Sequence, residues 1–258
     1  MRRSAGGRVS LPVLLLVFCF LGVSTGCVLV DPDPFPATAF LAHAGEIKEL
    51  PSRAPWQGTW FSDQKRLLML ARTYGRIHIA PVNVSYAEQQ LREAIRDEHI
   101  RRVRIEELRQ VARFMREAFR IKIEDYAEGH ILKVLDEKSS GAIVLELAIV
   151  EVKPTNFAAN AAGTIAGFFL PGGGLIKLAA KGSVAMEGVL RDGATGEILM
   201  EFKDRRSDKN SPFSVKDFQE YAHIRASISE WAAEFAELLA TPADHRVKSG
   251  LPFSVLPF

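Results

Sequence analysis

The chain has 258 residues, of which 47% are hydrophobic and 25% are charged, and its formal net charge is +2. This composition is typical of a globular protein and argues against a disordered or fibrous one. The small and evenly mixed charge disfavours a nucleic-acid-binding protein, and the basic cluster at residues 101–104 is better explained as the solvated flank of a helix. We therefore expect one domain with terminal extensions and no nucleic-acid partner.

The N-terminal region has the pattern of a secretory signal peptide. Residues 11–23 form an apolar segment, and a positively charged region precedes it, with Arg2, Arg3 and Arg8. The apolar segment is shorter than the roughly 20 residues that cross a bilayer as a helix. We predict a signal peptide over residues 1–26, whose removal would change the net charge from +2 to −1 because it contains three arginines and no acidic residue.

Cys27 follows the small residues Val-Ser-Thr-Gly. This sequence resembles the lipobox of bacterial lipoproteins, in which the cysteine is lipidated and becomes the first mature residue; Ser24 departs from it, since leucine is usual there. Cys19 lies inside the predicted signal peptide, so Cys27 would have no disulfide partner in the mature chain. We predict a lipid anchor on Cys27 that holds the protein at the membrane. The alternative is a secretory signal followed by a bystander cysteine.

Two further features concern the region after Cys27. Val28 stands where an aspartate would favour inner-membrane retention in enteric bacteria, so the predicted location is the outer membrane, on its periplasmic face. Residues 27–62 are predicted to form a lipidated N-terminus and a proline-rich tether. Trp56 and Trp60 lie near its end. They either hold this loop against the domain or form a ligand-stacking pair, which would make the protein a binding module for a small or lipidic ligand.

Residues 63–241 are predicted to form an α/β domain. Alternation over residues 76–84 predicts a strand, with Pro81 at its end or at a sheet edge. Ser85 is predicted to cap the next helix, and apolar spacing predicts a second helix over residues 105–119. Residues 121–137 predict a short helix.

The centre of the domain is predicted to be a sheet. Residues 143–152 are apolar on both faces, as in a central strand that is covered on both sides. Alternating residues around 184–190 and 198–203, joined by Asp-Gly-Ala-Thr-Gly, predict a β-hairpin. A long helix that ends before Pro242 would follow. The predicted fold class is α+β: a mixed, mostly antiparallel sheet packed with helices, and a long C-terminal helix. The tail, residues 242–258, would either dock onto the domain or bind a partner.

A glycine-rich apolar insert occupies residues 157–181, between the first two central strands. Its small residues recur at helical spacing, which permits close helix packing, although neither arm could span a bilayer. The insert would contact lipid, another subunit or an envelope partner, or else fold over its own domain. The predicted interaction residues are Gly163, Gly167, Phe168, Phe169, Pro171, Gly172, Gly173 and Gly174.

Catalytic chemistry finds no support in the sequence. Nucleophile-elbow, zinc-protease, paired-cysteine and phosphate-loop patterns do not occur, and the six histidines are scattered without helical pairing. We therefore predict a non-enzymatic protein with no metal and no cofactor, and we nominate no catalytic residue.

Several segments together resemble one bacterial lipoprotein family, the domain of unknown function 3313. They are the Val-Lys-Pro-Thr that begins at Val152, the Phe-Phe-Leu-Pro-Gly-Gly-Gly over 168–174, the Gly-Ser-Val-Ala that begins at Gly182 and the Arg-Asp-Gly-Ala-Thr-Gly-Glu over 191–197. The resemblance extends from about Phe40 to Leu239 and implies an envelope lipoprotein without a known activity. The order of elements is also similar to the α/β domains of envelope lipoproteins related to the curli secretion channel. Fold analogy of this kind does not establish function.

Overall fold

The computed structural model describes residues 34–48, 53–126, 132–153, 183–207 and 222–248, all within one compact unit, Pro32–Phe258. Its strands are β1 (Gly58–Phe61), β2 (Arg76–Ile79), β3 (Lys133–Leu135), β4 (Ile143–Lys153), β5 (Ser183–Asp192) and β6 (Ile198–Ser207). Its helices are η1 (Ala44–Glu46), α2 (Gln64–Tyr74), α3 (Ser85–Ala94), α4 (Glu98–Asp125) and α6 (Ala222–Ala240).

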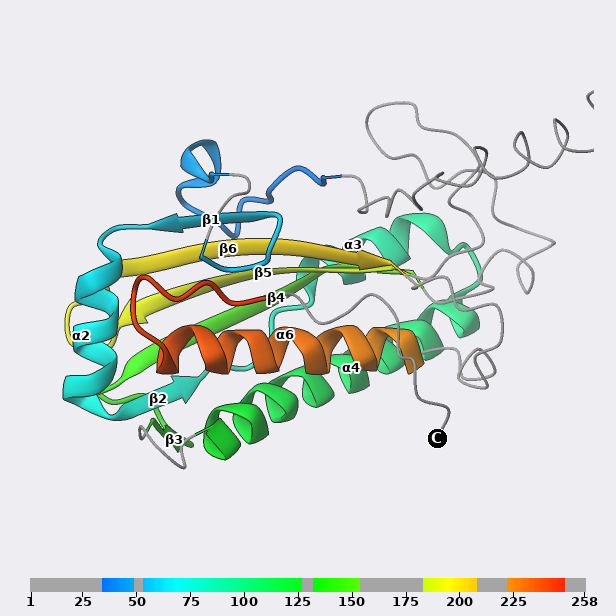
Figure 1. Cartoon of the computed structure of the whole chain (residues 1–258). Helices are drawn as coiled ribbons and strands as arrows, with labels where there is room; N and C mark the ends of the chain where they lie inside the picture. The colour runs from blue at the N-terminus through cyan, green and yellow to red at the C-terminus, as the bar shows by residue number, and fades with distance from the viewer. Residues whose placement is uncertain (1–33, 49–52, 127–131, 154–182, 208–221, 249–258) are drawn as a thin grey trace, which may run out of the picture. The chain divides into compact units, whose positions relative to one another are not determined.

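The six strands form one sheet in the order β1-β6-β5-β4-β2-β3. The pairs β1–β6, β6–β5 and β5–β4 are antiparallel, whereas β2 pairs in parallel with both β4 and β3. Helices α4 and α6 run side by side along one face, and residues 34–48 lie on the other side of the sheet (Figure 1). The predicted class, a mixed and mostly antiparallel sheet packed with helices, is confirmed.

The central strand and the hairpin follow the predicted pattern. β4 lies inside the sheet and is buried on both faces, as its apolar sequence requires. β5 and β6 have ten residues each and pair over nearly their whole length, and the turn between them uses Gly196 at φ +76°, a conformation that favours glycine. Asp192 stabilises this turn because its side chain accepts a hydrogen bond from the backbone N–H of Ala194 at 2.9 Å.

Helix ends in this chain are fixed by local capping. Asp97 begins α4 by accepting the N–H of Ile100 at 2.9 Å, so this helix is longer than the predicted 105–119. Asp63 begins α2 in the same way, and Gly75 ends α2 at φ 57°. The end of α6 at Ala240, before Pro242, agrees with the prediction.

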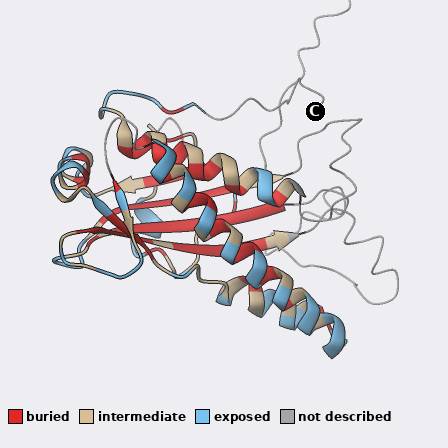
Figure 2. Ribbon diagram, turned by 90° about the horizontal axis from the view of Figure 1, so that it is seen from below, coloured by how far each residue is buried: buried red, intermediate tan, exposed pale blue. Residues whose placement is uncertain are grey.

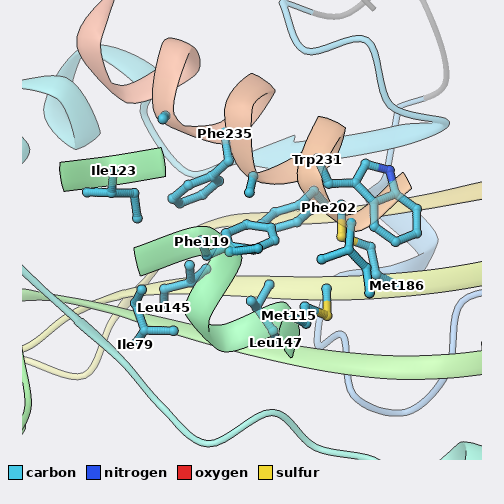
Figure 3. Packing of buried hydrophobic residues seen from close by; sticks show 14 of the residues in the cluster. Ile79, Met115, Phe119, Ile123, Leu145, Leu147, Met186, Phe202, Trp231 and Phe235 are labelled. Atoms are coloured by element: carbon cyan, nitrogen blue, oxygen red, sulfur yellow. The ribbon is translucent and has the colours of Figure 1, made fainter. Parts of the chain in front are cut away.

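The main core fills the space between the sheet and α2, α4 and α6. Helices α2 and α4 each present a buried stripe to the sheet and an exposed stripe to solvent, whereas the described residues of α6 are mostly buried or half-buried (Figure 2). The centre of the core is an aromatic cluster in which Phe235 lies 5.5 Å from Phe119 and 6.0 Å from Phe202, measured between ring centroids (Figure 3). Burial of such rings supplies much of the hydrophobic stabilisation of a domain.

Two local predictions are wrong. The short helix expected over residues 121–137 is not formed, since α4 continues to Asp125 and Lys133–Leu135 form strand β3. β3 is held by parallel pairing with β2 and by the hydrogen bond from Lys133 N to Gly75 O, so a tertiary contact overrides the local preference. Ser85 is the first residue of α3 and not its cap; its N–H donates to the side chain of Asn83 at 2.8 Å.

The folded unit also begins before the predicted domain boundary at residue 63. β1, which ends at Phe61, is an edge strand of the sheet paired with β6. Phe35 and Leu41 are buried further upstream. Part of the predicted tether, residues 27–62, therefore belongs to the domain.

Candidate functional site

Cys27 and the insert residues Gly163, Gly167, Phe168, Phe169, Pro171, Gly172, Gly173 and Gly174 lie outside the described residues. The same holds for the tail beyond Lys248. The start of the tail does dock on the domain, because Val247 is buried and its N–H donates to Arg53 O at 3.0 Å.

The structure adds a feature that the sequence did not reveal, a docked N-terminal segment, which we call the strap (residues 34–48). It crosses the face of the sheet opposite α4 and α6, over β5 and β6. Thr38 is its first fixed point, since both its backbone N–H and its hydroxyl donate to the carboxylate of Glu187 on β5, at 2.6 and 2.5 Å. Glu187 is completely buried, so these charge-assisted bonds replace its lost hydration.

A second carboxylate holds the middle of the strap. The backbone N–H groups of Ala42 and His43 donate to the two oxygens of Glu201 on β6, each at 2.8 Å. The imidazole of His43 also lies 3.4 Å from Glu201 and stacks on the ring of Trp60 with 3.7 Å between centroids. Glu201 is fully buried as well. Two carboxylates thus bind four donors from the strap.

A lysine and a small apolar cluster complete this attachment. Lys203 lies opposite Glu187 in the ladder, and its ammonium donates to Phe35 O at 2.7 Å. Phe35 packs with Ala148, Val150 and Ala185 on the same face of the sheet, with Phe40 and Tyr86 at the edge of this cluster. The strap is therefore bound by two carboxylates, one cation and an apolar contact.

Burial determines the protonation behaviour of Glu187. Loss of hydration raises its pKa above the usual range, and the hydrogen bonds from Thr38 and the charge of Lys203 partly oppose this rise. The strap therefore has two opposite effects on Glu187. It removes the carboxylate from water, and its hydrogen bonds stabilise the charged form of that carboxylate.

The helix-facing side of β6 carries a different charged group, which we call the β6–α6 network. Arg206 donates to Asp204 at 3.1 Å, to Glu230 at 2.9 Å and to Glu234 at 2.6 Å. Trp231 donates its indole N–H to Asp204 at 2.6 Å. The network joins β6 to α6 across an otherwise apolar interface.

The pKa values of both buried acids in this network are raised. For Asp204 and Glu234 the cause is burial, and the positive charge of Arg206 opposes it in each case. The contacts of Arg206 and Trp231 tie strand β6 to helix α6, so the network acts as a structural clamp.

The predicted pair of tryptophans is separated by the fold. Trp56 is completely buried in the main core, where its ring lies 4.5 Å from Phe202 and its N–H donates to Glu234 at 2.9 Å. Trp60 is on β1 and stacks on His43 of the strap. The hypothesis that both line one ligand site is wrong, and the alternative, that they hold the loop on the domain, is confirmed.

The described ranges contain no group of three or more His, Cys, Asp or Glu residues able to hold a metal ion. His78 is buried, and its ring atom Nδ1 bonds Leu135 O at 3.1 Å. None of the described helices combines the length and apolarity that a membrane crossing requires.

The family is established by comparison of sequences. The model of the protein family of unknown function DUF3313 matches residues 68–235, and the chain belongs to this family. The resemblance seen in the sequence motifs is thereby confirmed. Among curated proteins, no sequence matches the chain.

The chain is distantly similar to several solved structures. The PelC dodecamer from Paraburkholderia phytofirmans has 11% identity and a TM-score of 0.35, covering 65% of this chain and 89% of PelC. A minor lipoprotein from Acinetobacter baumannii has 11% identity and a TM-score of 0.28, covering 65% of this chain and 93% of that one. The hypothetical protein CT253 from Chlamydia trachomatis has 10% identity and a TM-score of 0.34, with coverage of 64% and 97%.

Proposed function

We propose that this protein is a lipoprotein of the bacterial outer membrane, anchored through Cys27 with its domain in the periplasm. The observation that supports it most is the continuity between the predicted anchor and the strap. Cys27 lies seven residues before Pro34, and the strap that begins there is bound to the sheet by Glu187 and Glu201. Seven extended residues span at most about 25 Å, so the lipid would keep the domain close to the membrane surface.

The proposed role is non-enzymatic: the domain acts as an envelope assembly or interaction component. The supporting feature is the insert, residues 157–181, which combines small residues at helical spacing with Phe168 and Phe169. It connects β4 and β5, the two longest-paired strands of the sheet, so a rigid scaffold holds both of its ends. Its partner is proposed to be a second copy or another envelope protein.

The anchor is tested with Cys27→Ser. We expect the substituted protein to move from the membrane fraction to the soluble periplasmic fraction, because acyl chains contribute about 0.8 kcal/mol per buried methylene. Cys19→Ser is the matched control, since that cysteine lies in the predicted signal peptide and should leave fractionation unchanged. Two results together would contradict the proposal: a Cys27→Ser protein that still sediments with membranes, and a wild-type N-terminal peptide whose mass shows no acyl chain.

The interaction role is tested by replacing residues 157–181 with a short Gly/Ser linker. We expect the replacement to abolish self-association or crosslinking to envelope proteins, measured by native mass spectrometry and in-cell crosslinking. The thermal unfolding midpoint serves as the control, because it reports whether the sheet still folds. Unchanged oligomeric state and unchanged crosslinks in a folded protein would contradict this role.

A further inference from the structure

A cavity of about 160 Å³ lies beside α4, where the parallel strands β2 and β3 end. Its apolar lining comes from Ile79, the last residue of β2, and from Val134 and Leu135 of β3. The volume is well above the roughly 10–15 Å³ that one water molecule requires, so a ligand group of several atoms fits. In open sheets with parallel strands, ligands bind outside the carboxyl ends of those strands.

Three arginines of α4 line this cavity: Arg113, Arg116 and Arg120. Their spacing of three and four residues places them along one side of the helix. Arg113 pairs with Glu106 at 2.8 Å, and Arg120 lies 3.3 Å from Asp136. The charges of these two arginines are thus partly compensated by neighbouring carboxylates.

Arg116 differs from its two neighbours. Its Nε donates to Ile79 O at 3.0 Å, which fixes the guanidinium at the end of β2. Among the described residues it forms no ion pair, and its two Nη groups donate to no protein acceptor. A fixed, half-buried guanidinium with free Nη donors that borders a cavity is suited to bind an oxyanion.

We propose that this cavity, the arginine pocket (Arg113, Arg116 and Arg120), binds a phosphate group. Arg116 provides the two parallel N–H donors, and Arg113 and Arg120 add positive charge at the rim. Glu117 and Asp136 also line the pocket, and their carboxylates favour a monoanionic group such as a phosphodiester over a more highly charged one. The source is either a free phosphate or the headgroup of a phospholipid, which share this chemistry.

The test uses purified Cys27→Ser protein, so that no acyl anchor contributes to vesicle binding. In one arm it is titrated with inorganic phosphate by calorimetry; in the other it is floated with phosphatidylglycerol vesicles. Arg116→Gln should weaken binding at least tenfold, and Arg116→Lys should weaken it less, because lysine keeps the charge and loses the two parallel donors. Glu117→Gln should tighten binding about threefold, the usual size of one exposed charge interaction.

The control is Arg109→Gln, which removes a charge elsewhere on α4, where Arg109 pairs with Glu88 at 2.9 Å. It should leave binding unchanged, and thermal unfolding should show that all variants are folded. Phosphate binding that Arg116→Gln removes supports a free-phosphate ligand. Vesicle binding alone, removed by the same substitution, supports a lipid headgroup. The proposal is overturned if neither probe binds, if Arg116→Gln binds as the wild type does, or if Glu117→Gln binds more weakly.

Discussion

The two faces of the sheet are covered by different means. The helix face is closed by α2, α4 and α6, whose apolar side chains pack around Phe235, and it also carries the charged β6–α6 network. The strap face is closed by an irregular segment that has few apolar contacts and is held through Glu187, Glu201 and Lys203. Both faces of β6 are buried, but one packs into an apolar core and the other is held by charge-assisted hydrogen bonds.

This difference has an energetic consequence. Apolar burial is non-directional and scales with area, so the helix face should carry most of the free energy of folding. When charged groups are buried, the free energy gained from their partners is little more than the free energy of hydration that they lose. The contacts of the strap face should therefore fix the orientation of the strap more than they stabilise the fold. The strap then specifies where the chain leaves the domain toward residue 27, and the helices specify whether the domain folds.

The largest expected effect is on the helix face. Phe235→Ala removes a completely buried ring that contacts Phe119, Phe202 and Trp56, and it should lower the free energy of unfolding by about 4 kcal/mol. Chemical denaturation measures this. Met69→Ala is the control, since Met69 is 57% exposed on α2 and should change stability by less than about 0.5 kcal/mol. Equal losses in the two proteins would remove the distinction between core and surface.

The β6–α6 network should come next. Arg206→Met leaves the buried carboxylates of Asp204 and Glu234 without their cation, and should cost about 3 kcal/mol at neutral pH. Arg92→Met, in an exposed pair with Glu88, is the control and should cost less than about 1 kcal/mol.

This substitution also has a pH dependence with a definite sign. Burial already raises the pKa of Asp204 and of Glu234 in the folded protein, and loss of Arg206 should raise both further. A raised folded-state pKa means that the folded state binds more protons than the unfolded state, so stability increases as pH falls toward the ordinary carboxyl values of about 4. The difference in the free energy of unfolding between wild type and Arg206→Met should therefore become smaller as the pH falls from neutral to about 5. A difference that grows over this range would contradict the assignment.

The strap should respond with a smaller loss of stability and a larger local effect. Glu187→Gln replaces one acceptor oxygen by an amide donor that faces the donors of Thr38, and should cost about 1 kcal/mol. Hydrogen exchange should accelerate at the amides of Thr38, Ala42 and His43. Thr38→Val, which keeps the backbone N–H and removes the hydroxyl, should give the weaker form of the same change. Unaltered exchange in Glu187→Gln would show that the carboxylate does not hold the strap.

The smallest effect is expected where the strap face is open. Arg191 and Glu146 lie on this face near the hairpin turn and form a pair at 3.0 Å, with 29% and 33% of the side chains exposed. Arg191→Gln should change the free energy of unfolding by less than about 1 kcal/mol, and less in high salt. If Arg191→Gln cost as much stability as Glu187→Gln, coverage by the strap would not explain why the two positions differ.

Local periodicity and turn chemistry in the sequence were sufficient for the central elements. The apolar run of β4 and the alternation of β5 and β6 around a glycine turn are local patterns in the sequence. They predicted these strands, and the long C-terminal helix α6 was predicted as well. α2 was missed, although Asp63 and Gly75 are capping signals at its two ends. The insert and Cys27 remain predictions.

Other features were decided by the tertiary structure. β3 exists because β2 supplies a parallel partner, and no local signal in Lys133–Leu135 distinguishes it from a helical turn. Arg116 is an ordinary polar-face residue of a helix in the sequence, and only the ends of β2 and β3 place a cavity beside it.

The strap shows the physical reason most directly. Glu187 and Glu201 alternate with apolar residues, a pattern that in a strand usually marks the solvent side. Their partners, Thr38 and Ala42, are separated from them by 149 and 159 residues. The sequence by itself determined the central strands β4, β5 and β6. Only the tertiary structure decided that the side of the sheet with Glu187 and Glu201 is covered too. The physical reason is that a hydrogen bond between segments distant in the chain produces no periodic pattern in the sequence of either segment.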